Sequence, residues 1–409
     1  MNPLRRLNPA ARVLVLASSV LVAQTACSSA PTGGSSTTDA RAPGVDVRVD
    51  AGVDAHGSTR DGYGADAGLG DADAGRRDTA GTPDGRADTG PKRPLLQVCD
   101  DAPEPSGLKT EDWENLQSRA IAALDADHSA RDAVTNPATD VTLEGKFTYG
   151  PTSKDLQGEK IEYWIDDCSG RYRKLGRAET NGDGRSELTL SASQLPPIGV
   201  YDLYLRVVGD NSSTKARLRV LPRKTEFVIF DIDGTLTTGD RQLRRDVVDD
   251  LFEPLKSGDY VPKARKKAAE ATKLRRRRQG YQVMYLTARP YWLKHRTRQW
   301  LDDKNMAPAT LRMTRSTAEG LPTNSGAGEY KKRELEHLKS EGFELVAAYG
   351  NSDTDVWAFE KAGIDKSRTY TTGESAGKNG TVDLGDDYAR HVRRLKKNGR
   401  PADQPFREH

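Results

Sequence analysis

Three short, mostly apolar runs, each followed at once by polar residues, organise the second half of the chain. They are Phe227–Phe230, Tyr281–Leu286 and Phe343–Tyr349, and their composition is typical of strands buried on both faces of a parallel sheet. Segments with helical spacing follow the second run and precede the third. We therefore predict an α/β domain with a parallel, Rossmann-like sheet over residues 223–400, ahead of a tail at 401–409.

A period of two precedes this domain. Apolar and polar residues alternate around Ile161–Ile165 and Tyr201–Val207, and Asn181–Gly184 is a turn signal between them. Several short strands in about eighty residues are typical of a small immunoglobulin-like β-sandwich, which we place at 138–222. Helical spacing in Glu111–Leu124 predicts a helical lead-in over 95–137.

The first part of the chain looks like an export signal and a tether. Three arginines precede the apolar run Val13–Ala23, as in a signal peptide spanning residues 1–26. The residues before Cys27 resemble a bacterial lipobox, so we expect a lipid on Cys27 or, alternatively, plain cleavage nearby. Residues 27–94 are rich in Asp, Ala and Gly and predict a disordered tether. Together they predict an exported protein, lipid-anchored on the periplasmic or surface side of a bacterial membrane.

Charge and cysteine content add little by themselves. The formal net charge is only +3 over 409 residues, so it points to no particular partner. Lys263–Arg278, however, holds nine basic residues and one acidic residue, Glu270. It is either a solvated helix face or a surface for anionic lipid or a phosphorylated substrate; the lack of interleaved aromatics argues against nucleic acid. Cys99 and Cys168 can pair only if the fold brings them together.

The chemistry-bearing residues stand at the ends of the three apolar runs. Asp231 and Asp233 follow the first run, and side chains two apart on an extended backbone point the same way. Two carboxylates this close repel, and Mg²⁺ is the usual remedy. One aspartate can then attack phosphorus while the other handles the proton of the leaving group. The alternative is an ordinary acidic turn, because Asp-Gly is a common turn dipeptide.

The order of these clusters resembles the haloacid dehalogenase superfamily of phosphotransferases. The resemblance implies that Asp231 is the nucleophile and Asp233 the general acid/base. It also implies that Thr287 grips the phosphoryl group and that Lys331, or else Lys332, neutralises it. The expected Mg²⁺ ligands are Asp231, Asp233, Asn351 and Asp355. The residues expected to contact the substrate are Gly234, Thr235, Ala288 and Arg289.

Within that superfamily, FDIDGTLT and YGNSDTDVWAF are most similar to the lipin-type phosphatidate phosphatases. This resemblance implies Mg²⁺-dependent hydrolysis of a lipid phosphate such as phosphatidate. Two other readings stay open. One is a phosphatase of soluble phosphate esters, and the other is a catalytically silent module that binds anionic lipid, as in some phosphatidylinositol-transfer proteins. The presence of both Asp231 and Asp233 argues against the silent module.

Overall fold

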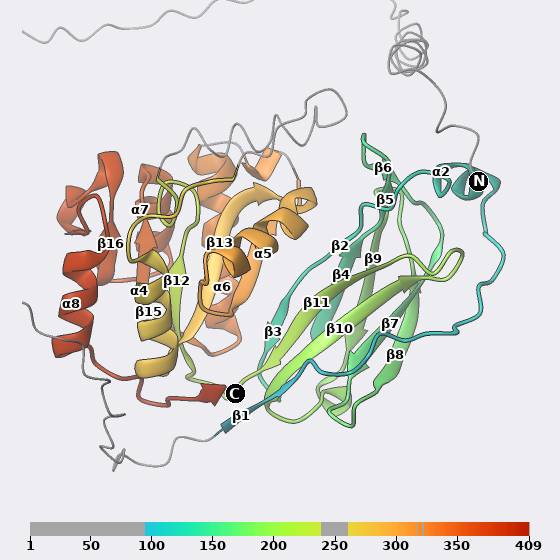
Figure 1. Cartoon of the computed structure of the whole chain (residues 1–409), viewed down its shortest axis with the longest axis horizontal. Coiled ribbons are helices and arrows are strands. Elements are labelled where there is room, and N and C mark those ends of the chain that lie inside the picture. The colour runs from blue at the N-terminus through green and yellow to red at the C-terminus, as the bar shows by residue number, and fades with distance from the viewer. Residues whose placement is uncertain (1–94, 239–260, 317, 321–322, 409) are drawn as a thin grey trace, which may run out of the picture. The chain divides into compact units, whose positions relative to one another are not determined.

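The structure is a computed structural model that describes residues 95–238, 261–316, 318–320 and 323–408. All of them belong to the unit Asp84–His409. The predicted signal peptide, Cys27, the tether and the segment 239–260 lie outside the described residues. Within the described part, strands of a β-sandwich precede an α/β domain along the chain (Figure 1).

The β-sandwich is built from a larger and a smaller sheet. Its seven-stranded sheet combines β1 (Leu95–Cys99), β3 (Ala133–Thr135), β7 (Lys160–Asp166), β8 (Tyr172–Glu179), β10 (Gly199–Val207), β11 (Ser213–Val220) and β18 (Arg407–Glu408). The three-stranded sheet contains β2 (Ser129–Ala130), β4 (Val141–Lys146) and β9 (Arg185–Leu190). A short hairpin, β5 (Thr148–Tyr149) and β6 (Lys154–Asp155), completes it.

Alternation along these strands explains the sandwich core. In β10 the residues Tyr201, Leu203 and Leu205 join the same apolar cluster as Ile161, Tyr163 and Ile165 of β7. The two strands pair antiparallel, with Leu203 opposite Ile165. Each such side chain contributes roughly 1.5–3 kcal/mol on full burial. The predicted period of two therefore corresponds to one face of the sandwich core, although residues on the opposite face, such as Tyr204 and Arg206, are buried as well.

The region expected to be a helical lead-in is different in the structure. Its helix, α2 (Leu116–Ile121), is only six residues long, and β1, β2 and β3 all lie between residues 95 and 137. β1 pairs in parallel with β10, a long-range partner that local helical spacing cannot reveal. Cys99 at the end of β1 forms a disulfide with Cys168, which ties this strand to the loop after β7.

The α/β domain contains a six-stranded sheet in the order β14-β13-β12-β15-β16-β17, and every neighbouring pair is parallel. The strands are β12 (Glu226–Phe230), β13 (Gln282–Pro290), β14 (Thr310–Thr314), β15 (Glu344–Gly350), β16 (Thr369–Thr371) and β17 (Val382–Asp383). The helices are α4 (Ala268–Lys273), α5 (Lys294–Asp303), α6 (Glu329–Ser340), α7 (Asp353–Lys361) and α8 (Ala389–Asn398). Parallel strands require such helical crossovers.

β12 is central because both of its faces are covered. Val228 and Phe230 belong to one apolar cluster, and Phe227 and Ile229 belong to another on the opposite face. The ring of Phe230 stacks on Tyr349 of β15 at 4.1 Å between centroids. A continuous apolar run is therefore needed here. Its carboxyl end, where the run stops, is the edge at which open α/β sheets bind ligands.

No helix among the described residues is long and apolar enough to cross a membrane.

Candidate functional site

The loop after β12 brings two carboxylates into the interior. The amide of Asp231 still donates to the carbonyl of Tyr349 at 3.0 Å, so the sheet ladder continues one residue beyond the strand. Asp231 is 3% exposed and Asp233 9%. The chain then turns at Gly234, whose φ of +75° favours glycine. The Gly234 amide donates to the Thr237 hydroxyl at 2.8 Å, which fixes the turn.

Lys331 of α6 lies between two aspartates. Its ammonium donates to Asp231 at 2.7 Å and to Asp355 at 2.5 Å, and the side chain is buried. Lys332, the reserve choice from the sequence, is half-buried and pairs with Glu329 of its own helix at 3.0 Å. The geometry thus places Lys331, and not Lys332, at the end of β12.

Asp233 is held by Arg289 of β13. The guanidinium donates from Nη2 to Oδ1 at 2.7 Å and from Nε to Oδ2 at 3.0 Å, and Arg289 is only 2% exposed. The hydroxyl of Thr287 adds a third hydrogen bond to Asp233, at 3.2 Å. Thr287 and Arg289 were expected to face a substrate, but in this structure both contact Asp233. A bidentate arginine fixes the orientation of the carboxylate that it contacts.

A local irregularity of β13 creates this arrangement. The register between β13 and β14 shifts between Leu286 and Pro290, so the intervening residues leave the regular ladder. A bulge of this kind re-aims side chains at a strand end. The sequence predicted the strand and its polar end but contained no signal for the bulge.

The loop after β15 contributes Asn351 and Asp355. Ser352 is the N-cap of α7 and forms a capping box with Asp355. Oδ2 of Asp355 accepts from the amides of Asn351 and Ser352 at 3.0 and 3.1 Å. Gly350 permits this approach, because a Cβ there would lie 2.6 Å from the Cβ of Asp355.

The side-chain oxygens of Asp231 and Asn351 converge on a single hydroxyl. Thr235 Oγ1 lies 2.9 Å from Asp231 Oδ2 and 3.1 Å from Asn351 Oδ1. A carboxylate oxygen and an amide oxygen thus lie within hydrogen-bonding distance of the same hydroxyl, and oxygens of these two kinds suit a hard cation.

The four expected Mg²⁺ ligands are therefore not brought together as one shell. Asp233 is occupied by Arg289, and Asp355 by Lys331 and the amides of its loop. Among the described residues, no group of three or more His, Cys, Asp or Glu side chains is arranged to hold a metal ion. Asp231 and Asn351 remain a fitting pair, because Mg²⁺ commonly takes one or two protein oxygens and completes its shell with water and phosphate.

The charge balance of the site perturbs Asp231. Among the described residues, the three carboxylates pair with two cations, Lys331 and Arg289, which leaves one surplus negative charge when all three carboxylates are ionised. Burial, together with the charges of Asp355 and Asp233, raises the pKa of Asp231 to about 7 against the opposing effect of Lys331. Asp355 is buried too, but Lys331 and the hydrogen bonds that Asp355 accepts from Asn351 and Ser352 lower its pKa. A divalent cation would relieve the surplus charge at Asp231.

Two residues that the sequence did not single out support the turn behind the site. Arg265 donates from Nε and Nη2 to the carbonyl of Gly234 at 3.0 and 2.9 Å. The Tyr388 hydroxyl donates to the carbonyl of Thr235 at 3.2 Å. Arg265 is one of nine basic residues in a run, so the pattern offered no way to distinguish it from its solvated neighbours.

Comparison with known proteins identifies two regions. Residues 228–373 match the family model "PITM 1-3, LNS2 domain", and residues 126–220 match "PITM 1-3, beta-sandwich domain". The chain is 29% identical over 316 residues to membrane-associated phosphatidylinositol transfer protein 1 of rat and of human. It is 28% identical over 306 residues to the protein retinal degeneration B of Drosophila melanogaster.

These matches cover 75%, 75% and 72% of this chain, but only 23%, 23% and 22% of the respective relatives. The chain thus spans about a quarter of the length of these relatives. Among solved structures, the sensor domain of the anti-sigma factor RsgI4 of Pseudobacteroides cellulosolvens is 16% identical, with a TM-score of 0.19. It covers 24% of this chain and 95% of the sensor domain, and at that TM-score it carries no argument.

The comparisons correct the family expected from the sequence. A lipin-type haloacid dehalogenase phosphatase in a secreted bacterial lipoprotein is wrong, because both matched models belong to phosphatidylinositol transfer proteins. The expected export to the outside of a bacterial membrane is wrong as well, since these relatives are animal proteins, and those of rat and human are named as membrane-associated. The strand-end motifs misled because they are short and concern only the local geometry of the site.

Proposed function

We propose that this chain binds the phosphate headgroup of a lipid at the carboxyl edge of its parallel sheet, together with Mg²⁺. The observation that carries the proposal is the buried cluster of Asp231, Lys331 and Asp355 beside the Asp231–Asn351 oxygen pair. The lipid class is supported by the matched relatives, whose names describe membrane-associated phosphatidylinositol transfer.

The charge balance makes the phosphate depend on the metal. The cluster already carries one surplus negative charge, so a phosphate dianion alone would be repelled. Mg²⁺ on Asp231 Oδ2 and Asn351 Oδ1 would supply two positive charges and additional oxygen coordination for phosphate. Asp355 keeps Lys331 in place, and Thr235 orients the two oxygens.

Hydrolysis of the phosphomonoester is a second candidate function, favoured by the presence of both Asp231 and Asp233. Asp231 Oδ would attack phosphorus and form an aspartyl-phosphate as the bond to the leaving oxygen breaks, and Asp233 would give that oxygen a proton. The arginine contact favours binding over turnover, since Arg289 donates to both carboxylate oxygens of Asp233, the group that would have to approach the leaving oxygen. Turnover would require Arg289 to move off Asp233.

A basic face is formed by α4, its flanking residues and α8, which Glu270 and Lys396 connect. Its exposed cations are Lys266, Lys267, Arg277, Arg278, Arg393, Arg394, Lys396 and Lys397. Glu270 is shared by Lys267 and Lys396. Part of the basic run is not on this face, because Arg275 is buried and donates to the Tyr349 hydroxyl at 2.8 Å. The remaining cations suit anionic lipid headgroups.

Vesicle flotation tests the proposal. Full-length protein is mixed with phosphatidylcholine vesicles that contain or lack phosphatidate, in Mg²⁺ or in EDTA, and phosphate release is followed in the same samples. We expect binding that requires both phosphatidate and Mg²⁺ and that Asp231→Asn weakens, since an amide replaces the charged oxygen ligand. The matched control is Asp353→Asn, an exposed carboxylate in the first turn of α7.

Equal binding to both kinds of vesicle, or binding unchanged by EDTA and by Asp231→Asn, would overturn the proposal. Metal-dependent phosphate release that Asp231→Asn abolishes would establish the hydrolytic function. The contribution of the basic face is measured as the loss of vesicle binding with increasing salt. Contacts between exposed charges weaken as the screening length falls from about 10 Å at 0.1 M to about 3 Å at 1 M.

A further inference from the structure

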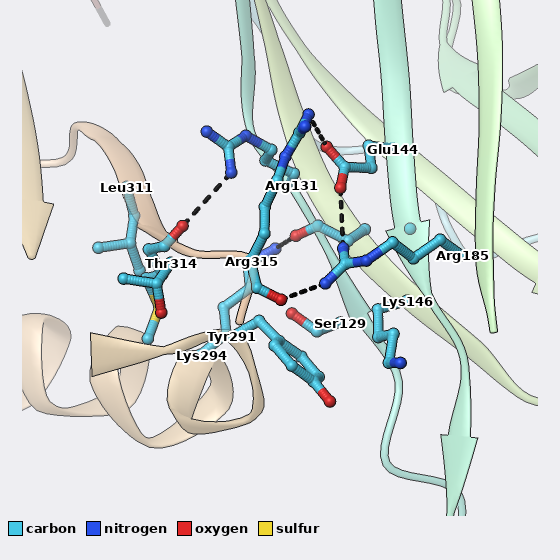
Figure 2. Close-up of a pocket in the computed structure, with 13 residues that line it drawn as sticks. Ser129, Arg131, Glu144, Lys146, Arg185, Tyr291, Lys294, Leu311, Thr314 and Arg315 are labelled. Atoms are coloured by element: carbon cyan, nitrogen blue, oxygen red, sulfur yellow. Dashed lines mark hydrogen bonds and ion pairs between the residues drawn. The ribbon is translucent and has the colours of Figure 1, made fainter. Parts of the chain in front are cut away.

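A small basic pocket lies where the sandwich meets the α/β domain (Figure 2). From the sandwich it is lined by Arg131, Glu144, Lys146 and Arg185, and from the α/β domain by residues that include Tyr291, Lys294 and Arg315. Its volume is about 30 Å³, room for roughly two water-sized groups. None of these residues belongs to the aspartate cluster described above.

The cations of the pocket outnumber the carboxylates that serve them. Glu144 is the lining residue with a carboxylate, and it accepts from both Arg185, at 2.9 Å, and Arg315, at 2.5 Å. Lys146 pairs with Asp155, and Arg131 pairs with Glu334. The ammonium of Lys294 donates to two carbonyl oxygens, those of Ala130 and Lys215.

Five lining cations thus meet three carboxylates, a surplus of two positive charges in a half-buried space. Neighbouring groups do not restore the balance. Asp132 acts on Lys294 but also pairs with Arg298, and Glu334 is shared with Arg312, so each of these carboxylates also serves a cation outside the pocket lining. Unbalanced charge that is partly removed from water is costly, and a bound anion is one way to offset it.

Tyr291 holds two of the cations in position. Its ring lies 5.5 Å from Lys146 Nζ and 5.5 Å from the guanidinium carbon of Arg185. Cations over an aromatic face are attracted by the ring quadrupole, so both side chains are ordered before any ligand arrives. A site with donors already in position loses less free energy on binding.

We propose that this pocket is a second, separate binding site for a phosphate group, from either a soluble phosphate or the headgroup of a lipid. The small volume holds about two oxygen atoms of one oxyanion, whose remaining oxygens would stay at the open side, and it admits neither a sugar ring nor an acyl chain. Guanidinium forks match phosphate oxygens in geometry and charge. Burial lowers the pKa of Lys294 to about 8, and a neighbouring anion would keep that ammonium charged.

The ligand would connect the two domains. Arg185 and Lys146 come from strands of the sandwich, whereas Lys294 and Arg315 come from the α/β domain. A phosphate group held by both sets would add cross-links to the existing Arg315–Glu144 pair. Binding should therefore raise the melting temperature of the full chain.

Two substitutions with opposite expected effects test this pocket. Arg315→Gln removes a guanidinium that is half-exposed at the mouth, so the fold should tolerate it, and phosphate should bind about tenfold more weakly. Glu144→Gln keeps the shape of the side chain and removes the competing carboxylate, so phosphate should bind several-fold more tightly. Arg177→Gln, which pairs with Glu111 and Glu162 elsewhere on the sandwich, is the matched control.

The measurement is titration calorimetry with inorganic phosphate in EDTA, performed on the full chain carrying Asp231→Asn. EDTA and the Asp231→Asn substitution together disable the metal-dependent site. The phosphate affinity of the basic pocket can therefore be measured whether or not the proposed function is right. A phosphate affinity that Arg315→Gln weakens and Glu144→Gln tightens supports the pocket. The absence of phosphate binding, or an affinity that all three substitutions leave unchanged, would overturn it.

A second arm distinguishes the two sources of the phosphate. The same variants are tested for flotation with vesicles of phosphatidylcholine plus phosphatidate, with and without excess inorganic phosphate. Loss of flotation in Arg315→Gln, and competition by free phosphate, would identify a lipid headgroup as the ligand. Flotation that is insensitive to both, alongside phosphate binding in the calorimeter, would identify a soluble phosphate.

Discussion

Replacing Asp231 by asparagine should stabilise the ligand-free protein at alkaline pH. Asp231 is buried, and its pKa is raised from 3.8 to about 7, so its ionised form is disfavoured in the folded state. A group with a raised folded-state pKa gives stability that is fully present below its unfolded pKa and is lost as pH rises through its folded pKa. For Asp231 that loss falls between about pH 4 and pH 7. Asparagine cannot ionise, so the variant does not undergo this pH-dependent loss of stability.

The magnitude follows from the shift. Each pKa unit corresponds to about 1.4 kcal/mol, and roughly two of the three units lie between pH 5 and pH 7. The free energy of unfolding of Asp231→Asn, relative to the wild type, should therefore rise by about 2–3 kcal/mol from pH 5 to pH 8. Urea denaturation in EDTA at several pH values measures this difference. Parallel pH curves for the two proteins, or a less stable variant at pH 8, would refute the reasoning.

Asp355→Asn is the matched comparison, because Asp355 contacts the same ammonium and has the opposite shift. Its pKa is lowered by Lys331 and by hydrogen bonds from its own loop, so its stabilisation is present above the unfolded pKa of about 4. That stabilisation is lost as pH falls through the folded pKa. The asparagine variant should be less stable than the wild type at pH 7, and the deficit should shrink in acid.

Three further outcomes are expected. Lys331→Met should lower the free energy of unfolding by about 3–5 kcal/mol, because it leaves Asp231 and Asp355 buried without their cation. Lys332→Met should change it by less than about 1 kcal/mol. Equal losses for the two variants in urea denaturation would contradict this prediction. Cys99→Ser, which opens a loop closed over 69 residues, should cost about 4 kcal/mol under oxidising conditions and nothing further in reductant. Millimolar Mg²⁺ should raise the melting temperature of the wild type at pH 8 more than that of Asp231→Asn; an equal rise in both would remove Asp231 from the metal site.

The strands of the α/β domain could be predicted from the sequence because they are buried on both faces. A run such as Phe227–Phe230 must be apolar at every position, because each face of the strand joins a separate apolar cluster. The polar ends of the runs also predicted that Asp231, Asp233 and Asp355 would lie at one edge of the sheet, whereas Lys331 was chosen only through the family resemblance. Their pairing was not predictable, since the choice of Arg289 for Asp233 depends on a bulge in β13.

The sandwich boundaries show the limit of local patterns. β1 and β3 are short and find their partners far along the chain, β1 with β10 and β3 with β11. Nothing within Leu95–Cys99 indicates such a partner. The basic pocket is similar, because Arg185 and Arg315 share Glu144 only after the two domains have met.

The strand order of the larger sandwich sheet has a consequence for the time course of folding. β1 pairs with β18, and Leu95 and Arg407 are about 310 residues apart, with the α/β domain between them (Figure 1). Closing so long a loop is entropically costly unless the intervening chain is already compact. The β1–β18 pairing should therefore form after the α/β domain, as a late step in refolding. Amide protection in β18 would then lag behind that in β12.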